Sequence, residues 1–198
     1  MINKKNNLWF SIIEILIGMF IFSLWIISIF ALISSSVRLN DYNKNYIIAA
    51  NLAREQLELL RFNRDYNYSK LQKFDQINPP LIGQIDPLDN YSNVLMDWKY
   101  YKVENNIENT ASFPINISEL SSAEFANDEK YRLCIDWNNM YVYCPVWTTL
   151  KKTPFYKYVY IDRTLWNTQL KITSKVIWKS KGEHEFKITT ILTDWKQL

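Results

Sequence analysis

An apolar run near the N-terminus constrains this chain most. The Leu8–Ile33 segment, 26 residues long, carries one charged side chain, Glu14. As a helix such a run extends about 39 Å, against about 30 Å for the hydrocarbon core of a typical bilayer. A removed signal peptide is the alternative, because a serine cluster follows at 34–36, but its apolar core is usually only about 7–15 residues. We therefore expect a retained membrane-spanning helix over residues 10–34.

Glu14 requires a physical reason, because an ionised side chain in hydrocarbon costs at least about 2.5 kcal/mol on insertion scales. One interpretation is functional, with an amine as its partner. The other is that Glu14, near the start of the run, reaches toward the lipid headgroups, as long side chains near helix ends do. The residues alone leave both interpretations open.

The segment from Phe10 to Glu14, Phe-Ser-Ile-Ile-Glu, resembles the start of the mature chain in type IV pilin-like proteins, which include the pseudopilins. In that family a short basic leader precedes a cleavage site, then Phe, then a hydrophobic helix with Glu as its fifth residue. Residues 1–9 fit such a leader, because Lys4 and Lys5 are its only charges and basic residues favour the cytoplasmic side. The family's leader ends in Gly. This chain has Trp9 there, which puts cleavage by a prepilin peptidase in doubt.

The resemblance implies processing between Trp9 and Phe10, methylation of Phe10, and pairing of Glu14 with the amine of a neighbouring subunit during assembly. Other pilin subunits would be the partners, through helix packing. The implied function is that of a minor pilin or pseudopilin, a structural subunit of a type IV pilus or a type II secretion-like filament. A minor subunit is favoured because Trp9 and the long irregular middle are departures that a bulk subunit should not show.

The implied location is the inner membrane, with a single pass, the N-terminus cytoplasmic and the C-terminal domain outside, and the cell surface after assembly. The alternative function is a solitary single-pass membrane protein with a periplasmic or extracellular binding or sensing domain. That alternative predicts an intact leader and no association with filaments.

The helical pattern continues beyond the apolar run. Residues 37–62 contain no Pro and no Gly, and apolar positions recur at spacings of three and four, which indicates an amphipathic helix. These positions are Tyr46, Ala50, Ala53, Leu57 and Leu60. We expect residues 35–62 to continue the helix and to pack on a globular domain formed by residues 63–198.

Residues 63–130 are rich in Pro, Asn, Asp and Ser, which predicts loops with one inserted strand around 94–103. Residues 131–198 predict an antiparallel sheet, because aromatic and β-branched residues alternate there. The expected strands are 131–136, 140–144, 156–162, 169–178 and 185–192. Turns are expected at Asn138-Asn139 and at 180–183, where Gly182 supplies a positive φ. The predicted fold class is α+β, with a long N-terminal helix packed on a C-terminal sheet, as in pilins.

The two cysteines, Cys134 and Cys144, flank the Asn138-Asn139 turn symmetrically. Antiparallel pairing about residue 139 would place them opposite one another, within reach of a disulfide. Such a bond persists in periplasmic or extracellular compartments. Two unlinked buried thiols are the alternative.

No pattern in the sequence predicts catalysis, a cofactor or a metal site. His184, the one histidine, lies between Glu183 and Glu185 and is expected to be a solvated turn residue rather than a general base. Two cysteines and one histidine are too few for structural zinc. Asp86, Asp89 and Asn90 lack the dense ligand pattern of a calcium loop. We expect a protein that is not an enzyme.

The sequence does not favour a nucleic-acid surface either. The net charge is +3, and lysines near the terminal hairpin accompany Trp178, which together could contact single strands. Alternating lysines are, however, the usual solvent face of an antiparallel sheet. The lysines are Lys171, Lys175, Lys179, Lys181 and Lys187.

Overall fold

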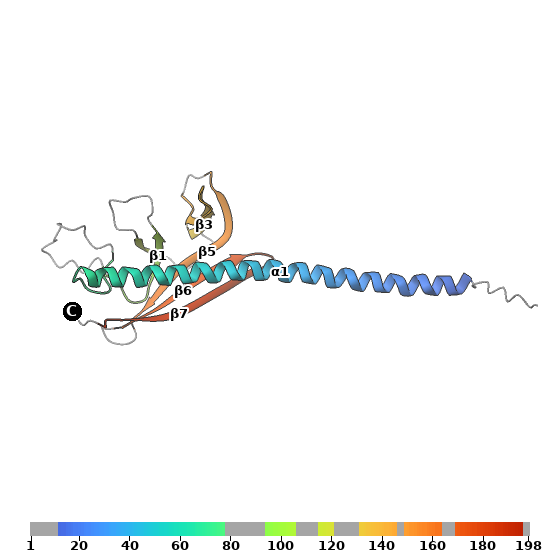
Figure 1. Ribbon diagram of the computed structural model, residues 1–198, viewed down its shortest axis with the longest axis horizontal. Helices are drawn as coiled ribbons and strands as arrows, with labels where there is room; N and C mark the ends of the chain where they lie inside the picture. The colour runs from blue at the N-terminus through green and yellow to red at the C-terminus, as the bar shows by residue number, and fades with distance from the viewer. Residues whose placement is uncertain are drawn as a thin grey trace, which may run out of the picture. The chain divides into compact units, whose positions relative to one another are not determined.

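The computed structural model describes residues 12–77, 94–105, 115–120, 131–145, 149–163 and 169–195. The chain divides into two compact units, Met1–Lys44 and Asn45–Leu198. One helix, α1 (Ile12–Ser69), contributes its first part to the first unit and its second part to the other unit, which also holds the described strands (Figure 1).

In the first unit, every residue of α1 from Ile12 to Lys44 is exposed. This part of the helix is long and apolar enough to cross a membrane. The hydroxyls of Ser23 and Ser28 donate to backbone carbonyl oxygens one turn earlier, at 2.8 and 2.9 Å. These bonds matter in hydrocarbon, where an unsatisfied polar group costs several kcal/mol.

Helix α1 ends in a Schellman motif. The Gln72 N–H donates to the Asn67 carbonyl at 2.9 Å and the Leu71 N–H to the Tyr68 carbonyl at 3.3 Å. Leu71 has a φ of 57°, the left-handed conformation that Gly usually supplies at this position. The predicted helix end at residue 62 is therefore wrong. No Gly marks the true end, and a leucine takes its place.

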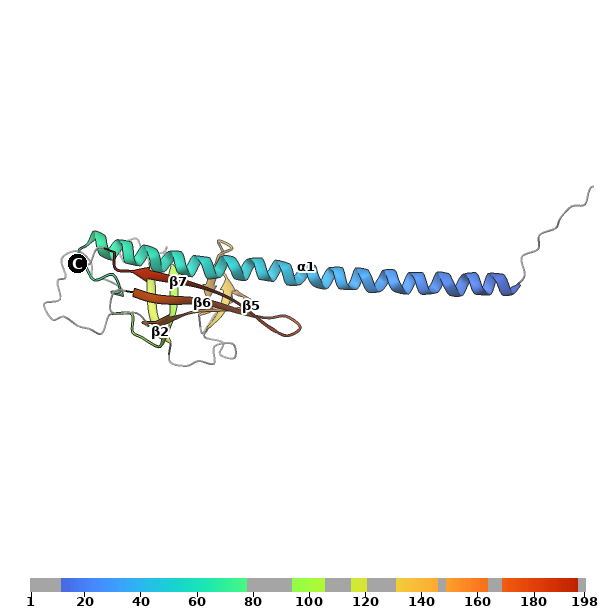
Figure 2. The same ribbon diagram turned by 90° about the horizontal axis from the view of Figure 1, so that it is seen from below.

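The second unit contains a seven-stranded sheet in which the described pairs are antiparallel (Figure 2). The strands are β1 (Lys99–Asn105), β2 (Ile115–Leu120), β3 (Arg132–Ile135), β4 (Tyr141–Tyr143), β5 (Lys151–Asp162), β6 (Gln169–Lys179) and β7 (Glu183–Thr193). The order is β2-β1-β5-β3-β4, and β6 pairs with β5 and β7. The predicted α+β layout of a long helix and an antiparallel sheet is confirmed.

The described residues of the region 63–130, which we predicted to be mainly loop, include two strands. Strand β1 begins at Lys99, whereas Val94 forms only an isolated bridge with Gln76. Strand β2 is absent from the prediction, because it is short and its flanking Asn, Ser and Pro residues are typical of loops. Its partner β1 supplies the hydrogen bonds that the local pattern does not reveal.

The turns use the residues that the sequence indicates. Asn139 has a φ of 59° between β3 and β4, and Gly182 has a φ of 147° between β6 and β7. Lys181 also takes a positive φ, of 52°. The β6–β7 hairpin keeps an uninterrupted register from Lys179 opposite Glu183 to Gln169 opposite Thr193.

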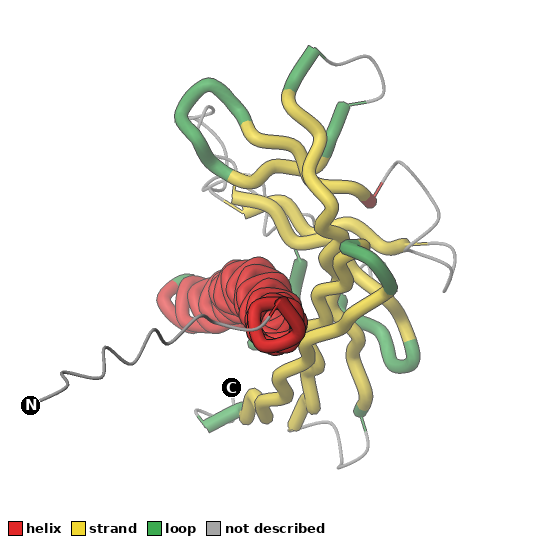
Figure 3. The backbone as a smooth tube through the Cα atoms, turned by 90° about the vertical axis from the view of Figure 1, so that its right-hand side faces the viewer, coloured by secondary structure: helices red, strands yellow, loops and turns green. Residues whose placement is uncertain are grey.

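Strand β5 has different partners along one of its edges. Its first half pairs with β3 up to Tyr156, and its second half pairs with β1 from Val159. Strand β6 runs along its other edge from Phe155 to Asp162. The strands spread apart toward one end of the sheet in Figure 3. We call the stretch of β5 between Tyr156 and Val159, where the partner changes, the sheet fork.

The core lies between the second part of α1 and the sheet. On the helix the buried apolar positions are Ala49, Leu52, Ala53, Leu57 and Leu60. The predicted helical face is therefore slightly rotated, since Ala50 is half-buried and Tyr46 is 42% exposed, although its ring contacts Phe186 edge to face at 5.2 Å. The sheet contributes the residues predicted to face the helix, which are Leu170, Ile172, Val176, Trp178, Phe186, Ile188 and Leu192.

Buried polar side chains fix the helix against the sheet and against its own following loop. Ser174 of β6 donates to Gln56 of α1 at 2.7 Å. Asn63 and Asn67, one turn apart, both donate to the Gln76 carbonyl, at 2.9 and 2.8 Å. Such bonds are directional, so they set the position of α1 along the sheet as well as its contact with it.

Candidate functional site

The first candidate site is the start of α1. Glu14 lies in the first turn and is exposed. Gly18 lies one turn further, on the same side of the helix, and a Cβ added there meets no described atom of the chain within 4 Å. The helix thus places a carboxylate beside a spot without a side chain, where another helix can approach closely. The predicted processing positions, Trp9 and Phe10, lie outside the described residues.

The predicted disulfide is present. Cys134 and Cys144 are bonded, with Cα atoms 5.0 Å apart. The predicted register is wrong, because Cys134 pairs with Val142, which centres the hairpin on residue 138 instead of 139. Cys144 follows β4, and its N–H donates to the Arg132 carbonyl at 2.9 Å. The disulfide therefore crosses the hairpin diagonally.

The β3–β4 turn owes its shape to Asp136. The Oδ1 atom of Asp136 accepts hydrogen bonds from the N–H groups of Asn138 and Met140, at 2.9 and 2.7 Å. The Asp136 N–H donates to the Met140 carbonyl at 3.0 Å. A carboxylate that organises its own turn explains why the hairpin centre differs from the one that the two asparagines suggest.

The terminal hairpin differs from two expectations of the sequence analysis: that His184 is a solvated turn residue, and that Trp178 could contact single-stranded nucleic acid. His184 is half-buried and stacks on Trp178 at 5.4 Å between ring centroids, with Nε2 3.2 Å from the Ser180 carbonyl. It is therefore not the solvated turn residue that we expected. Trp178 is fully buried, so it cannot stack with nucleic-acid bases. Lys175 lies 2.5 Å from Glu185, and the hydrogen bond from Lys175 holds the pKa of Glu185 below its usual value.

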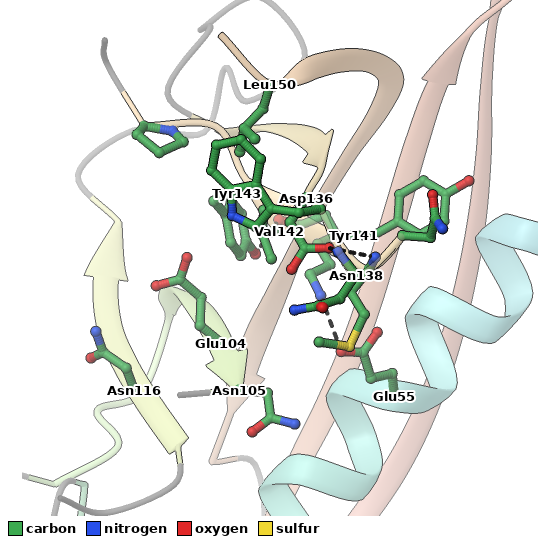
Figure 4. Close-up of a pocket in the computed structure, with 15 residues that line it drawn as sticks. Glu55, Glu104, Asn105, Asn116, Asp136, Asn138, Tyr141, Val142, Tyr143 and Leu150 are labelled. Atoms are coloured by element: carbon green, nitrogen blue, oxygen red, sulfur yellow. Dashed lines mark hydrogen bonds and ion pairs between the residues drawn. The ribbon is translucent and has the colours of Figure 1, made fainter. Parts of the chain in front are cut away.

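The second candidate site is a cavity of about 760 Å³ at the sheet fork (Figure 4). Helix α1 lines it with Glu55, and the β1–β2 pair lines it with Glu104, Asn105 and Asn116. Strand β4 and the turn before it line it with residues 136–143. The cavity could not be predicted from the sequence, because its walls come from segments that are far apart along the chain.

Lys157 of β5 lines the cavity at the fork. It is 2% exposed, and its Nζ lies 3.6 Å from Glu55 Oε1. Burial lowers the pKa of Lys157, while the carboxylates of Glu55 and Glu104 oppose that change. The ammonium is therefore held by nearby negative charge in a place where water solvates it poorly.

Tyr143 of β4 joins the two sides of the fork. Its hydroxyl donates to the Lys157 carbonyl at 2.8 Å and is also hydrogen-bonded by the Val103 backbone of β1. The Nζ of Lys102 lies 4.4 Å from the centre of its ring. Burial, followed by the charges of Glu104 and Glu55, raises the pKa of Tyr143 well above its usual value. The phenol thus stays neutral and continues to bond across the fork.

The sequence holds one signal that could have found Lys157. Along β5 it alternates in phase with Phe155, Val159 and Ile161, all of which are buried. A lysine at an inward position of a strand needs a partner for its charge. The alternation along the strand could be seen in the sequence, but the sequence did not identify Glu55 on α1 as the partner of Lys157.

The described residues contain no group of three or more His, Cys, Asp or Glu side chains that could hold a metal ion. Asp86, Asp89 and Asn90, weighed as a calcium loop, lie outside the described residues. Comparisons with protein-family models, with curated proteins and with solved structures found no match to this chain.

Proposed function

We propose that this chain is a minor pilin or pseudopilin, a structural subunit that is held in the membrane by the first part of α1 and then packed by the same segment into a filament. The observation that carries the proposal is the exposed apolar surface of α1 from Ile12 to Ile33, interrupted by one charge, Glu14.

A bilayer can cover that apolar surface, and so can a bundle of equivalent helices. Large apolar side chains are exposed on every side of this segment, for example 69% for Trp25 and 65% for Ile13. In lipid alone, Glu14 would have to reach toward the headgroups to leave the hydrocarbon. In a bundle of helices, an amine of a neighbouring subunit would supply a partner of opposite charge, and such a pair is strong where water is excluded.

The second unit is consistent with a location outside the cytoplasm. The Cys134–Cys144 disulfide is of the kind that persists in oxidising compartments. With basic Lys4 and Lys5 preceding the apolar run, the proposed orientation places the N-terminus in the cytoplasm.

The test replaces Glu14 in native cells that lack the original copy of the gene. Glu14→Ala and Glu14→Gln both remove the charge, and Gln keeps the size. We expect either change to reduce the amount of the protein in sheared filaments about tenfold or more, because the loss of one favourable ion pair in a water-poor contact exceeds about 1.4 kcal/mol. The amount in the membrane fraction should stay unchanged.

Glu58→Gln is the matched control. Glu58 is exposed on the second part of α1, where its Oε1 lies 2.5 Å from Nη1 of Arg61 in the same helix. This variant should therefore enter filaments normally. Normal entry of the Glu14 variants would refute the charge-pairing role. A wild-type protein found solely in the membrane, with residues 1–9 still attached, would favour the solitary membrane protein instead.

A further inference from the structure

We propose that the cavity at the sheet fork binds a short, neutral, hydroxyl-rich ligand, namely an oligosaccharide. The inference does not depend on filament assembly, because all the residues that form the cavity belong to the Asn45–Leu198 unit. A volume of about 760 Å³ lies within the range of about 300–1,000 Å³ that is common for small-ligand sites.

The cavity is built around a buried charge. Lys157 is 2% exposed, and a strand rarely places an ammonium at an inward position. Glu55 balances it at 3.6 Å, and Glu104 is balanced by Lys102 at 2.8 Å. Asp136 is occupied by the backbone of its own turn. The lining therefore mixes polar and apolar groups. A polyanion would find no cation that is not already balanced, and a polycation would find one carboxylate, Asp136, which the N–H groups of its own turn already engage.

Four side-chain amides supply unused hydrogen-bonding capacity. They belong to Asn105 and Asn116 on the β1–β2 side and to Asn138 and Asn139 on the turn side. All four residues are exposed, and within the described part of the chain none of these amides bonds to another protein group. Each amide offers donors and an acceptor. A sugar hydroxyl is also both donor and acceptor, so it can satisfy such groups from both walls.

The rim presents an aromatic platform. Trp137 is 78% exposed, and its ring makes no contact with another described ring. The turn that carries it is held by Asp136 and, just beyond, by the Cys134–Cys144 disulfide. An exposed indole on a rigid turn leaves a large apolar face in water without a folding benefit. The face of a sugar ring, which consists of C–H groups, covers such an indole well and needs no charge.

The experiment uses the full chain in lipid nanodiscs, prepared without glycoside detergents because these would compete for the cavity. Isothermal titration calorimetry measures binding of neutral probes (maltotriose, cellotriose, lactose and N,N′-diacetylchitobiose) and of charged probes (3′-sialyllactose, a heparin disaccharide and trilysine). A neutral tetrapeptide tests the alternative of a peptide ligand. We expect binding of at least one neutral sugar and weaker binding of every charged probe.

Trp137→Ala should weaken the sugar affinity about tenfold, because a stacked aromatic contact contributes on the order of 1.4 kcal/mol. Asn116→Ala should weaken it as well, and both sites are exposed, so the fold should remain. Trp98→Ala is the matched control, since Trp98 is 66% exposed and does not line the cavity; its affinity should equal that of the wild type. The proposal is overturned if no neutral sugar binds, if a charged probe or the tetrapeptide binds more tightly, or if Trp137→Ala binds as the wild type does.

Discussion

At the scale of single residues, several side chains tie distant parts of the second unit together. Tyr68 is one of them. It lies near the end of α1, and its hydroxyl donates to Asp194 Oδ1 at 3.0 Å and accepts from the Trp195 N–H at 3.1 Å. Burial, followed by the hydrogen bond to Asp194, raises the pKa of Tyr68 from 10.0 to about 12. The phenol thus connects the helix end to the chain that follows β7.

This pKa predicts how stability depends on pH. Because the folded-state pKa is raised, the contribution of Tyr68 is fully present below pH 10.0 and is lost as the pH rises toward about 12. We expect the free energy of unfolding of the Asn45–Leu198 unit to fall more steeply over that interval in the wild type than in Tyr68→Phe. Urea unfolding at a series of alkaline pH values, followed by circular dichroism, measures both slopes.

Asp194→Asn provides the control for this interpretation, because it keeps the hydrogen bond but removes the negative charge. Its loss of stability should begin near the same pH, which the unfolded state sets, but should end at a lower pH and be smaller in total than in the wild type, because the Asp194 charge no longer raises the pKa of folded Tyr68. Equal slopes in the wild type and Tyr68→Phe would show that Tyr68 ionises alike in the folded and unfolded states.

At the scale of elements, the two parts of α1 meet different environments and therefore need different sequences. From Ala49 to Tyr68 one face is buried against the sheet, so its sequence must be amphipathic. From Ile12 to Lys44 every residue is exposed, so the composition of this part must suit whatever surrounds the helix. Gly18 stands out there, because a glycine costs a helix interior about 1 kcal/mol relative to alanine and the described chain shows no contact that requires it.

Gly18→Leu tests whether another helix requires that space. A Cβ added at residue 18 meets no other part of the described chain within 4 Å apart from the neighbouring backbone of its own helix, and leucine has a higher helix propensity than glycine, so membrane level and fold should be unchanged. If α1 packs against neighbouring subunits at the Glu14–Gly18 side, the bulky side chain should reduce filament incorporation several-fold, measured by quantitative immunoblot of sheared filaments. Ile17→Leu, at an adjacent position that is already bulky, is the control. Incorporation of Gly18→Leu at the level of this control would place the helix contact elsewhere.

At the scale of the whole molecule, the sequence predicts the parts that local patterns determine. The apolar helix, the terminal hairpin and its inward residues follow from periodicities of 3.6 and 2. The Leu71 helix end, strand β2 and the register of the β3–β4 hairpin do not follow, because they depend on hydrogen bonds that the local composition does not reveal. The cavity is less predictable still, since it needs Glu55, Asn116 and Lys157 to meet through the sheet fork.

The division of the chain at Lys44 predicts that residues 45–198 fold by themselves. The buried positions among the described residues begin at Ala49, and the core clusters of the described residues, with the side chains packed against them, contain nothing before Ile48. We expect this fragment to be soluble, to keep the Cys134–Cys144 disulfide and to unfold cooperatively on heating, as measured by near-ultraviolet circular dichroism. A fragment starting at Asn63 lacks the helix residues that cover the sheet and should aggregate. Aggregation of the longer fragment as well would mean that the first unit contributes to the stability of the second.

The sheet fork has a consequence for how a family of such chains can diversify. The β5–β6–β7 ladder runs along one side of β5 from Phe155 to Asp162, and the described residues of the two hairpins on the other side form no strand pairing with each other. Insertions or deletions in one hairpin therefore leave the ladder and the other hairpin in register. Evolution can remodel the walls of the cavity one at a time, while the helix and the three long strands preserve the scaffold.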